Sequence, residues 1–271
     1  MDIPTLFNVK DKVILVTGGA KGLGLMISTA FVTNGARVYI SSRDSATCTT
    51  AAADLTALGP GTAIALPADL SLASECTRLA SEIAAREKCL HVLVNNSGAT
   101  WGESYDGFPD SAWSKLLTLN LQRVFTLTQV LTPLLEAAGA ASKEGASGVV
   151  TDPGRVIHIG SIDGIRVPAL PTFAYSASKA GLHHLSRHLA VELGPRGITS
   201  NTLACGPFPS KMMAATLRDF GEEIKGANPL GRIGTPGDAA GACLFLASKA
   251  SAFVNGATLT LDGGVSLVSK L

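Results

Sequence analysis

Apolar residues are distributed along the chain in two alternating patterns. Short runs of Val, Ile and Leu are apolar at every position, as expected for strands covered on both faces of a sheet. Between them lie longer stretches rich in Ala and Leu, which are typical of helices. Strands are predicted at residues 13–16, 38–40, 63–66, 91–94, 155–159, 198–203 and 257–261, and helices at residues 22–34, 46–58, 72–87, 111–137, 174–193 and 236–247.

This alternation predicts the fold class. Strands joined by helices make right-handed crossovers and form a parallel sheet between two helical layers. We therefore expect an α/β, Rossmann-like, doubly wound sheet, with residues 1–271 in one domain because no linker interrupts them. The small, polar residues 139–154 predict a surface excursion, and residues 206–232 predict a mobile flap over the substrate. Pro133 predicts a kink or an early end in its helix.

Charge and cysteine content narrow the class of protein. The formal net charge is +1, so we expect neither nucleic acid nor a membrane surface as a partner. No apolar run approaches the ~20 residues of a membrane span, and the N-terminus does not resemble a signal peptide. The five cysteines are scattered and odd in number, which favours a reducing, cytoplasmic compartment.

A glycine-rich turn, TGGAKGLG, follows the first predicted strand and opens a helix. Glycines let the backbone approach a pyrophosphate, which the N–H groups and dipole of the helix attract. A similar turn also occurs without a ligand, but the strand–turn–helix context favours nucleotide binding. The candidate cofactor-binding residues here are Thr17, Gly18, Lys21, Gly22, Leu23 and Gly24.

Tyr175 and Lys179 lie four residues apart on a predicted helix and so share one face. A cation there favours the phenolate and lowers the pKa of the tyrosine from its ordinary value of ~10. Such a tyrosine exchanges protons more readily at neutral pH. The same spacing also arises by chance on solvated helices, so its meaning depends on other motifs.

Two further motifs lie between the glycine turn and this pair. The run NNSG occupies residues 95–98, and Ser161 follows a later strand. In this order the motifs resemble the short-chain dehydrogenase/reductases, and the resemblance extends over residues 10–264. Residues 168–178, 209–213 and 261–264 resemble a narrower group, the fungal and bacterial 3-oxoacyl-[acyl-carrier-protein] reductases of the rhamnolipid type.

The resemblance implies hydride transfer between a nicotinamide and a carbonyl or alcohol group, with Asn120, Ser161, Tyr175 and Lys179 as catalytic residues. Reduction of a ketone builds negative charge on its oxygen, which needs a hydrogen-bond donor and then a proton. Tyr175 would supply the proton, Ser161 would hold the oxygen, and Lys179 would also bind the nicotinamide ribose. Asn120 would hold a water that links the lysine to solvent. Taken singly, Ser161 is an ordinary turn residue and Asn120 an ordinary helix residue.

The resemblance also assigns residues to the adenosine half of the cofactor. Asp69 and Leu70 would flank the adenine, while Asn95, Ser97 and Gly98 would line the ribose. The family usually has alanine at the position of Ser97.

The end of the second strand favours NADP(H) over NAD(H). NAD-binding sheets usually have an acidic residue there, which binds the ribose 2′-hydroxyl. This chain has Ser42 and Arg43 instead, and a guanidinium can bind a 2′-phosphate. Lys21 is a second cation for that site. The alternative is that both cations are simply solvated.

Cys205 departs from the family, which usually has proline there. The following Gly206, Phe208 and Ser210 occupy the places that contact the nicotinamide carboxamide by resemblance. Loss of the proline frees φ and leaves a backbone N–H to satisfy, so weaker cofactor binding or a shifted flap is expected. A nucleophilic role for Cys205 is disfavoured because no base adjoins it in sequence.

The substrate is expected at the carboxyl ends of the strands. Flexible and apolar candidates there indicate a bulky, mostly apolar carbonyl compound, although each residue could instead be ordinary core. His184 and His188 have helical metal-ligand spacing but lack a third ligand, so we predict no metal site. The candidate substrate residues are Trp101, Asp163, Ile165, Phe208, Met212 and Met213.

Two further functional hypotheses stay open. One is a fatty-acid type 3-oxoacyl-[acyl-carrier-protein] reductase, for which Arg123, Arg166 and Lys211 are available but form no obvious basic cluster. The other is an NADP-binding protein with a non-redox role, such as cyclisation or regulation, because a fold does not fix a function. By resemblance the chain would form a homodimer or homotetramer.

Overall fold

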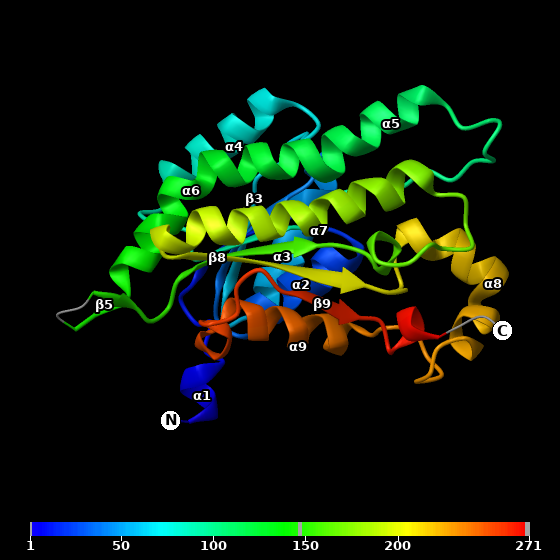
Figure 1. Cartoon of the computed structure of the whole chain (residues 1–271). Helices are drawn as coiled ribbons and strands as arrows, with labels where there is room; N and C mark the ends of the chain where they lie inside the picture. Colours follow the sequence, from blue (N-terminus) through cyan, green and yellow to red (C-terminus); the bar gives the residue numbers. More distant parts are fainter. Residues whose placement is uncertain (1, 146–147, 269–271) are drawn as a thin grey trace.

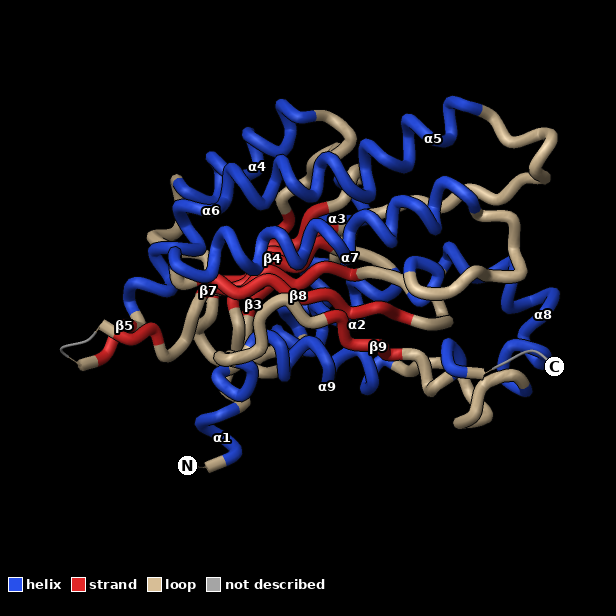
Figure 2. The backbone as a smooth tube through the Cα atoms, viewed as in Figure 1, coloured by secondary structure: helices blue, strands red, loops and turns tan. Residues whose placement is uncertain are grey.

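The computed structural model describes residues 2–145 and 148–268. Seven parallel strands form one sheet in the order β3-β2-β1-β4-β7-β8-β9. Helices lie on both sides of this sheet (Figures 1 and 2). The α/β doubly wound prediction is therefore confirmed. The strands are β1 Val13–Thr17, β2 Arg37–Ser41, β3 Thr62–Ala65, β4 Val92–Asn95, β7 Gly154–Ile159, β8 Ile198–Cys205 and β9 Thr258–Leu261.

The two helical layers bury separate cores, and β1 shows why its strand is apolar throughout. Val13 and Leu15 pack into the core under α4, α6 and α7, whereas Ile14 and Val16 pack into the core under α2, α3 and α9. Successive strand residues point to opposite faces, so both faces need apolar residues. The helices are α1 Ile3–Leu6, α2 Gly22–Thr33, α3 Ser45–Ala57, α4 Ala73–Ala84, α5 Asp110–Leu117, α6 Arg123–Ala141, α7 Phe173–Leu193, α8 Ala214–Gly226 and α9 Pro236–Ala247.

The helix predicted at residues 111–137 differs from the one observed. A π-helical segment, Thr118–Gln122, separates α5 from α6, and α6 continues through Pro133 to Ala141. The early end predicted at Pro133 is wrong. The missing proline N–H leaves the carbonyl of Gln129 without its helical partner, and both residues are exposed, so water can replace that bond.

The stretch Asp110–Ala141 is also long and apolar enough to cross a membrane by length and composition, which the sequence reading had not expected. In the structure, Leu127, Leu131 and Leu135 of this stretch are buried in the core beneath the helical layer. After α6 the chain forms a hairpin, in which β5 (Lys143–Glu144) pairs with β6 (Val149–Val150). Residues 146–147 of the predicted excursion lie outside the described residues.

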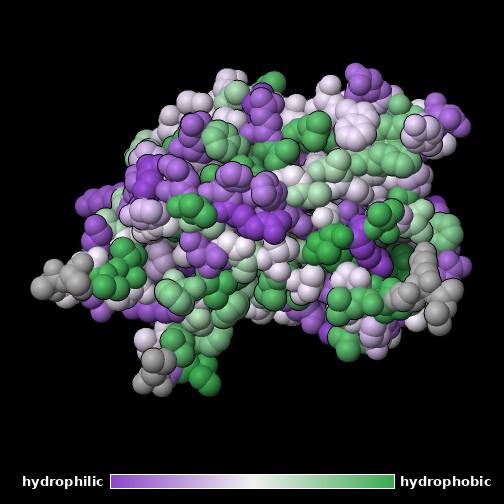
Figure 3. Space-filling model, viewed as in Figure 1, coloured by the Kyte–Doolittle hydropathy of each residue, from purple (hydrophilic) through white to green (hydrophobic). Residues whose placement is uncertain are grey.

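The carboxyl ends and the amino ends of the strands lie at opposite edges of the sheet, and different kinds of residues surround them. β8 and β9 point toward the end of the molecule that carries α8 (Figure 1). In the space-filling view, hydrophobic residues gather around that end (Figure 3). Segments at this carboxyl edge contribute the exposed apolar residues Ile165, Val167, Leu170, Met212 and Leu230.

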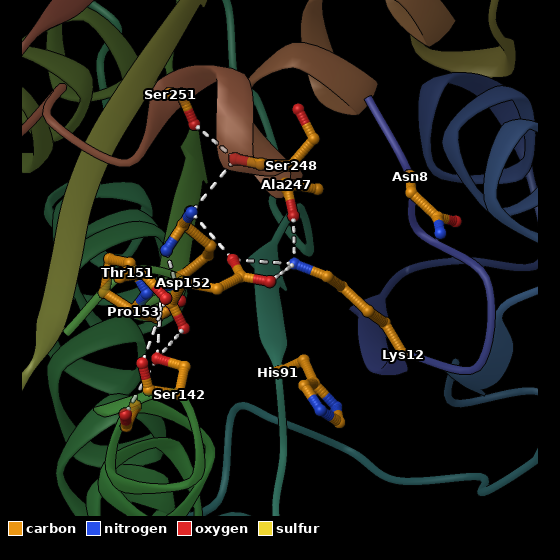
Figure 4. Close-up of polar contacts among 12 residues, drawn as sticks. Asn8, Lys12, His91, Ser142, Thr151, Asp152, Pro153, Ala247, Ser248 and Ser251 are labelled. Atoms are coloured by element: carbon orange, nitrogen blue, oxygen red, sulfur yellow. Dashed lines mark hydrogen bonds and ion pairs between the residues drawn. The ribbon is translucent and has the colours of Figure 1, made fainter. Parts of the chain in front are cut away.

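At the opposite, amino edge a charged cluster joins three elements (Figure 4). Lys12 Nζ, just before β1, lies 2.8 Å from Asp152 Oδ2 and donates to the carbonyl of Ala247 at 3.0 Å. Arg155 in β7 is 1% exposed and donates to Asp152 at 3.0 Å and to the carbonyl of Ser248 at 2.9 Å. The cluster therefore ties the starts of β1 and β7 to the end of α9.

Candidate active site

The backbone of the glycine turn after β1 packs closely against other segments of the chain. Gly18 and Gly22 have φ values of 65° and 52°, which side-chain-bearing residues rarely adopt. A Cβ on Gly18 would lie 2.7 Å from Asn96 Nδ2, and one on Gly22 would lie 3.1 Å from Ser210 Cβ. The turn thus brings together β1, the segment after β4 and the segment after β8, as the predicted cofactor residues require.

The start of α2 presents uncapped N–H groups beside this turn. Lys21 is the N-cap residue and is exposed, and its side chain makes no capping hydrogen bond. Leu23 and Gly24 belong to the first turn of α2, where backbone donors have no partner within the helix. An anionic phosphate group fits these donors, so the turn fits the pyrophosphate of a dinucleotide.

Asn96 holds the glycine turn in place, a role that the sequence reading missed. Its Nδ2 donates to the carbonyls of Thr17 at 2.8 Å and Gly18 at 3.3 Å. Thr17 Oγ1 in turn accepts from the backbone N–H groups of Asn96 and Ser97, both at 2.9 Å. Ser97 and Thr17 therefore lie side by side at the turn, and their contact with the cofactor stays a prediction.

Asn95, by contrast, is directed away from the cofactor side. Its side chain is buried, donates to Thr128 Oγ1 at 3.2 Å and lies 3.4 Å from His158 Nδ1. The structure thus does not support contact between the Asn95 side chain and the ribose. The physical reason is strand alternation, which turns Asn95 into the core and leaves Asn96 toward the turn.

Arg43 is exposed just beyond the end of β2, and none of the ion pairs among residues 2–145 and 148–268 involves it. The next residue, Asp44, accepts from the Thr47 N–H at 2.9 Å through one carboxylate oxygen and so caps α3. The carbonyl of Ser42 accepts from Ala68 N at 3.1 Å. That bond brings the neighbouring Asp69 and Leu70 alongside the end of β2.

The π-helical segment aims Asn120 at the loop after β4. Its Oδ1 accepts from Ala99 N and its Nδ2 donates to Ala99 O, both at 2.9 Å. Nδ2 also donates to Ser178 Oγ at 3.0 Å. A Cβ on Gly98 would lie 3.2 Å from Asn120 Oδ1 and 3.8 Å from Lys179 Nζ, so these three residues converge.

Lys179 is buried and donates to the carbonyl of Ile159 at 2.7 Å, at the end of β7. Burial lowers the pKa of Lys179 to about 8, and the nearby Cys205 opposes that shift. Because one hydrogen bond uses one of three ammonium hydrogens, the group keeps donors for a ligand.

Ser161 follows β7 and caps a one-turn helix, Ile162–Gly164. Its N–H donates to His183 Nε2 of α7 at 3.4 Å, which links the serine to the helix that carries Tyr175. Ser161 and Tyr175 lie close enough for the serine hydroxyl to lower the tyrosine pKa by hydrogen bonding. The predicted catalytic residues therefore meet at the carboxyl edge of the sheet.

The predicted effect of Lys179 on Tyr175 is wrong for this structure. Burial raises the pKa of Tyr175 to about 12, and the Ser161 hydrogen bond offsets this only partly. Lys179 Nζ lies 5.7 Å from the centre of the tyrosine ring and bonds to Ile159 O instead. Desolvation of the phenolate is therefore the main cause of the shift, and the charge of Lys179 is not among its causes.

Cys205 is the last residue of β8 and is buried. Its position pairs with Leu261 of β9, and the next residue, Gly206, donates to Leu261 O at 3.0 Å. The pairing of β8 with β9 therefore extends to the last residue of β8. Burial raises the pKa of the Cys205 thiol to about 12, which makes a nucleophilic thiolate unfavourable.

The predicted substrate residues divide into two groups. Phe208 is 4% exposed and packs under Gly234 as part of the core, so its ring is not part of an exposed surface. Trp101, Ile165 and Met212 are 38%, 51% and 48% exposed at the carboxyl edge. Their exposure fits the apolar substrate surface that the sequence predicts.

An aromatic cluster beside this surface was not predicted. Phe108 lies 5.4 Å from Phe173 and 6.2 Å from Trp113, and Tyr105 lies 6.0 Å from Phe173. Glu103 N donates to Pro171 O at 3.2 Å, so the loop after β4 is fastened to the segment before α7. The sequence signal was the concentration of aromatic residues at positions 101–113.

The fold and site define a dinucleotide-binding oxidoreductase of the doubly wound α/β class. The profile of a family described as Enoyl-(Acyl carrier protein) reductase matches residues 18–266. The chain belongs to the short-chain dehydrogenase/reductase family.

Curated relatives differ in what they act on. The chain is 39% identical to the rhamnolipids biosynthesis 3-oxoacyl-[acyl-carrier-protein] reductase of Pseudomonas aeruginosa, over 96% of this chain and 98% of that protein. It is 32% identical to a galactitol 2-dehydrogenase of Cereibacter sphaeroides, over 98% and 100%. It is also 32% identical to the short-chain dehydrogenase/reductase PhomF of Diaporthe leptostromiformis, over 96% and 92%. The predicted resemblance to the rhamnolipid type is confirmed.

Solved structures agree with the fold and the cofactor. The Pseudomonas aeruginosa RhlG/NADP active-site complex matches with a TM-score of 0.89 and 38% identity, over 97% of this chain and 99% of that one. A gluconate 5-dehydrogenase from Burkholderia cenocepacia, in complex with NADP and tartrate, matches with a TM-score of 0.88 and 27% identity, over 99% and 100%. These complexes confirm the prediction of NADP(H) as the cofactor.

Proposed function

We propose that this protein is an NADP(H)-dependent carbonyl reductase, or alcohol dehydrogenase in the reverse direction, acting on a bulky, mostly apolar ketone or secondary alcohol of secondary metabolism. One observation carries the proposal: Asn120, Ser161, Tyr175 and Lys179 converge beside the glycine turn. Membership of an oxidoreductase family supports the same reaction type.

When bound, NADPH would supply a hydride to the carbonyl carbon and would thereby become NADP⁺. Ser161 and Tyr175 donate hydrogen bonds to the carbonyl oxygen as negative charge develops on it. Tyr175 then gives its proton to that oxygen, which completes the alcohol and leaves a phenolate. Because burial raises the tyrosine pKa to about 12, the phenol is protonated before the reaction, as an acid must be.

Lys179 and Asn120 support this proton transfer. The buried ammonium of Lys179 keeps donors beyond its bond to Ile159 O, and these fit the hydroxyl groups of a ribose beside Tyr175. Asn120 uses its amide on Ala99 and Ser178, so its role in this structure is to hold the loop that carries Gly98 against Lys179.

Arg43 favours NADP(H) over NAD(H) for this chain. Its guanidinium is exposed at the end of β2, where NAD-binding sheets have an acid. The adjacent acid, Asp44, is held by Thr47 N at the start of α3. A 2′-phosphate would therefore have an exposed guanidinium near it, while one oxygen of the Asp44 carboxylate caps α3. The NADP complexes of the relatives support this choice.

A 3-oxoacyl-[acyl-carrier-protein] reductase is the second candidate, favoured by the name of the 39% identical relative. Its carrier protein would need basic residues near the site. Arg123 donates to Ser71 O and Arg166 to Val265 O, while Lys211 is exposed in the segment before α8.

A non-redox role is disfavoured because every predicted proton-transfer residue is present in a connected arrangement.

Substitution of Tyr175 by phenylalanine tests the proposal. Tyr175→Phe removes the proton donor but retains the ring, so NADPH oxidation against a panel of ketones should fall by ~10³-fold or more. NADPH binding, followed by fluorescence titration, should change little. Tyr39→Phe is the matched control, because its hydroxyl bonds to Glu87 away from the site. Its turnover should remain near that of the unaltered protein.

Two results would contradict the proposal. Normal ketone reduction by Tyr175→Phe would remove the tyrosine from the mechanism. NADPH binding by the unaltered protein without turnover of any ketone would favour the non-redox class instead.

The predicted homo-oligomer stays part of this proposal. Phe125 on α6 and Val191 on α7 are 43% and 79% exposed, and apolar side chains on outer helical surfaces fit a contact with a second copy.

A further inference from the structure

Asp163 lies between catalytic residues but has no part in the proton transfer described above. It is the middle residue of the one-turn helix Ile162–Gly164, which begins directly after Ser161. Its backbone N–H donates to Ser161 Oγ at 3.1 Å. The backbone of Asp163 is therefore fixed beside the hydroxyl that we propose to hold the substrate oxygen.

The same short helix is pressed against α7. A Cβ on Gly164 would lie 2.7 Å from the backbone of both Lys179 and Ala180, so no space separates the two elements. Asp163 is consequently held near the Tyr175 side of α7. After burial, which is the main cause, the charge of Asp163 also raises the pKa of Tyr175.

The Asp163 carboxylate has no direct polar partner in the described part of the chain. Among the residues that the structure describes, neither of its oxygens accepts a hydrogen bond or forms an ion pair. Asp152 and Asp238, in contrast, are both paired with arginine. The pKa of Asp163 is raised by burial, and the charge of Arg166 opposes that shift and favours the carboxylate.

We propose that Asp163 determines substrate specificity by accepting a hydrogen bond from a hydroxyl group on the carbon next to the substrate carbonyl. The substrate class is an α-hydroxy ketone, or the corresponding vicinal diol when the reaction runs in reverse. This inference rests on the proposed function, because it places the carboxylate beside the reacting carbonyl.

The chemistry of the carboxylate selects a hydroxyl group. A carboxylate has acceptors only, so it needs a donor from the substrate when bound substrate displaces water from it. Arg166 is near enough to offset the charge, which reduces the preference for a cationic amine. A substrate carboxylate at the same place would be repelled by Asp163.

A hydroxyl donor would also assist the proton transfer. The hydrogen bond draws negative charge away from the side of Tyr175, which reduces one cause of the raised phenol pKa. Hydroxy ketones would thus gain in binding, and the corresponding diols would gain in the reverse step, where the phenolate acts as the base.

The test compares three matched ketones with NADPH: 2-hydroxyacetophenone, acetophenone and phenylglyoxylate. For the unaltered protein we expect kcat/KM for the hydroxy ketone to exceed that for acetophenone by about 10-fold or more. Phenylglyoxylate should react slowest. Asp163→Ala should remove most of the preference, chiefly by raising KM for the hydroxy ketone.

Two variants keep this test interpretable. Asp163→Asn retains an acceptor oxygen without the charge, so it should keep part of the preference and accept phenylglyoxylate better than the unaltered protein. Asp54→Asn, at an exposed position on α3, should keep the full preference. Thermal unfolding by circular dichroism checks that each variant is folded.

Equal kcat/KM for the hydroxy ketone and acetophenone would overturn the inference, and so would a preference that survives in Asp163→Ala. In both cases ketone turnover would still support the proposed function. Failure to reduce any of the ketones would contradict the proposed function and the inference together.

Discussion

At the scale of single residues, two adjacent asparagines have opposite environments. Asn95 bonds to Thr128 in the core, whereas Asn96 bonds to the carbonyls of Thr17 and Gly18. A strand turns successive side chains to opposite faces, so a shift of one position exchanges these roles. The sequence predicted the importance of the motif, but the three apolar residues of β4 did not indicate which asparagine faces which side of the sheet.

The Tyr175–Lys179 pair shows a second limit of sequence reasoning. Helical spacing correctly predicted that the two side chains share one side of α7, with the ammonium 5.7 Å from the ring centre. It could not predict that burial raises the tyrosine pKa and that the lysine charge is not among the causes of the shift. Desolvation depends on packing by residues far away in the sequence.

Arg43 carries the prediction of cofactor choice at this scale. Arg43→Ala removes the cation from the end of β2, so KM for NADPH should rise by about 10-fold or more, as expected for loss of a charge-assisted hydrogen bond. KM for NADH should change little, because NADH has no 2′-phosphate. Steady-state kinetics with each cofactor measures both values.

Arg86→Ala serves as the control, since Arg86 is an exposed arginine paired with Glu82 on α4. It should leave both KM values unchanged. Equal affinity for NADPH and NADH, unaltered in Arg43→Ala, would contradict the assignment.

At the scale of elements, the long helix before β7 departs most from its prediction. Its apolar spacing indicated one helix, but the π-helical segment Thr118–Gln122 interrupts it at Asn120. Such a segment occurs where one extra residue is accommodated in a helix, and these segments are frequent at functional sites. The side chain of Asn120 reaches Ala99 from this segment, a contact between distant parts of the chain that local sequence does not reveal.

The charged cluster at the amino edge predicts a large cost for a single substitution. Asp152→Ala leaves two buried cations, Lys12 and Arg155, without their carboxylate. Removal of one partner from a buried ion pair costs about 3–5 kcal/mol, so the free energy of unfolding in urea should fall by that order. Ketone reduction per folded molecule should persist, because the cluster lies at the opposite edge from the site.

Asp219→Ala is the matched control on an exposed helix. Its ion pair with Arg218 is accessible to water, and such pairs contribute about 0–1 kcal/mol. If Asp152→Ala were no less stable than Asp219→Ala, the cluster would not tie the strands together as described.

At the scale of the whole molecule, the alternation of strands and helices predicted the sheet and its two helical layers. The β5–β6 hairpin was not predicted, because each strand has two residues and no recognisable period. Motif order predicted the residues that meet at the carboxyl edge, and their catalytic role stays a proposal. The contacts of Asn96, Phe208 and the aromatic cluster were not predicted, because they depend on packing across the sheet.

Buried histidines predict how stability depends on pH. Burial lowers the pKa of His158 to about 3 and that of His183 to about 4, whereas an unfolded histidine titrates near 6.5. The unfolded chain therefore binds more protons below pH 6.5, and stability is lost as the pH falls from 6.5 toward 4. The free energy of unfolding in urea should be lower at pH 5.5 than at pH 7.5.

His158→Gln should show a weaker pH dependence over this interval, whereas His188→Gln, at an exposed position on α7, should match the unaltered protein. Ordinary carboxylates titrate below this interval and do not obscure the comparison. Stability that stayed constant from pH 7.5 to 5.5 would contradict the burial of two neutral histidines.

Gly234 N donates a hydrogen bond of 2.9 Å to Pro207 O. This bond joins the two ends of the segment that carries α8. Phe208 packs under Gly234 between these two ends, and Gly206 N donates to Leu261 O of β9. Residues 209–233 thus form an appendage whose two ends leave the sheet at one point. Such an appendage can be lengthened, shortened or exchanged between relatives without altering strand register, so substrate range can diverge while the hydride-transfer machinery stays the same.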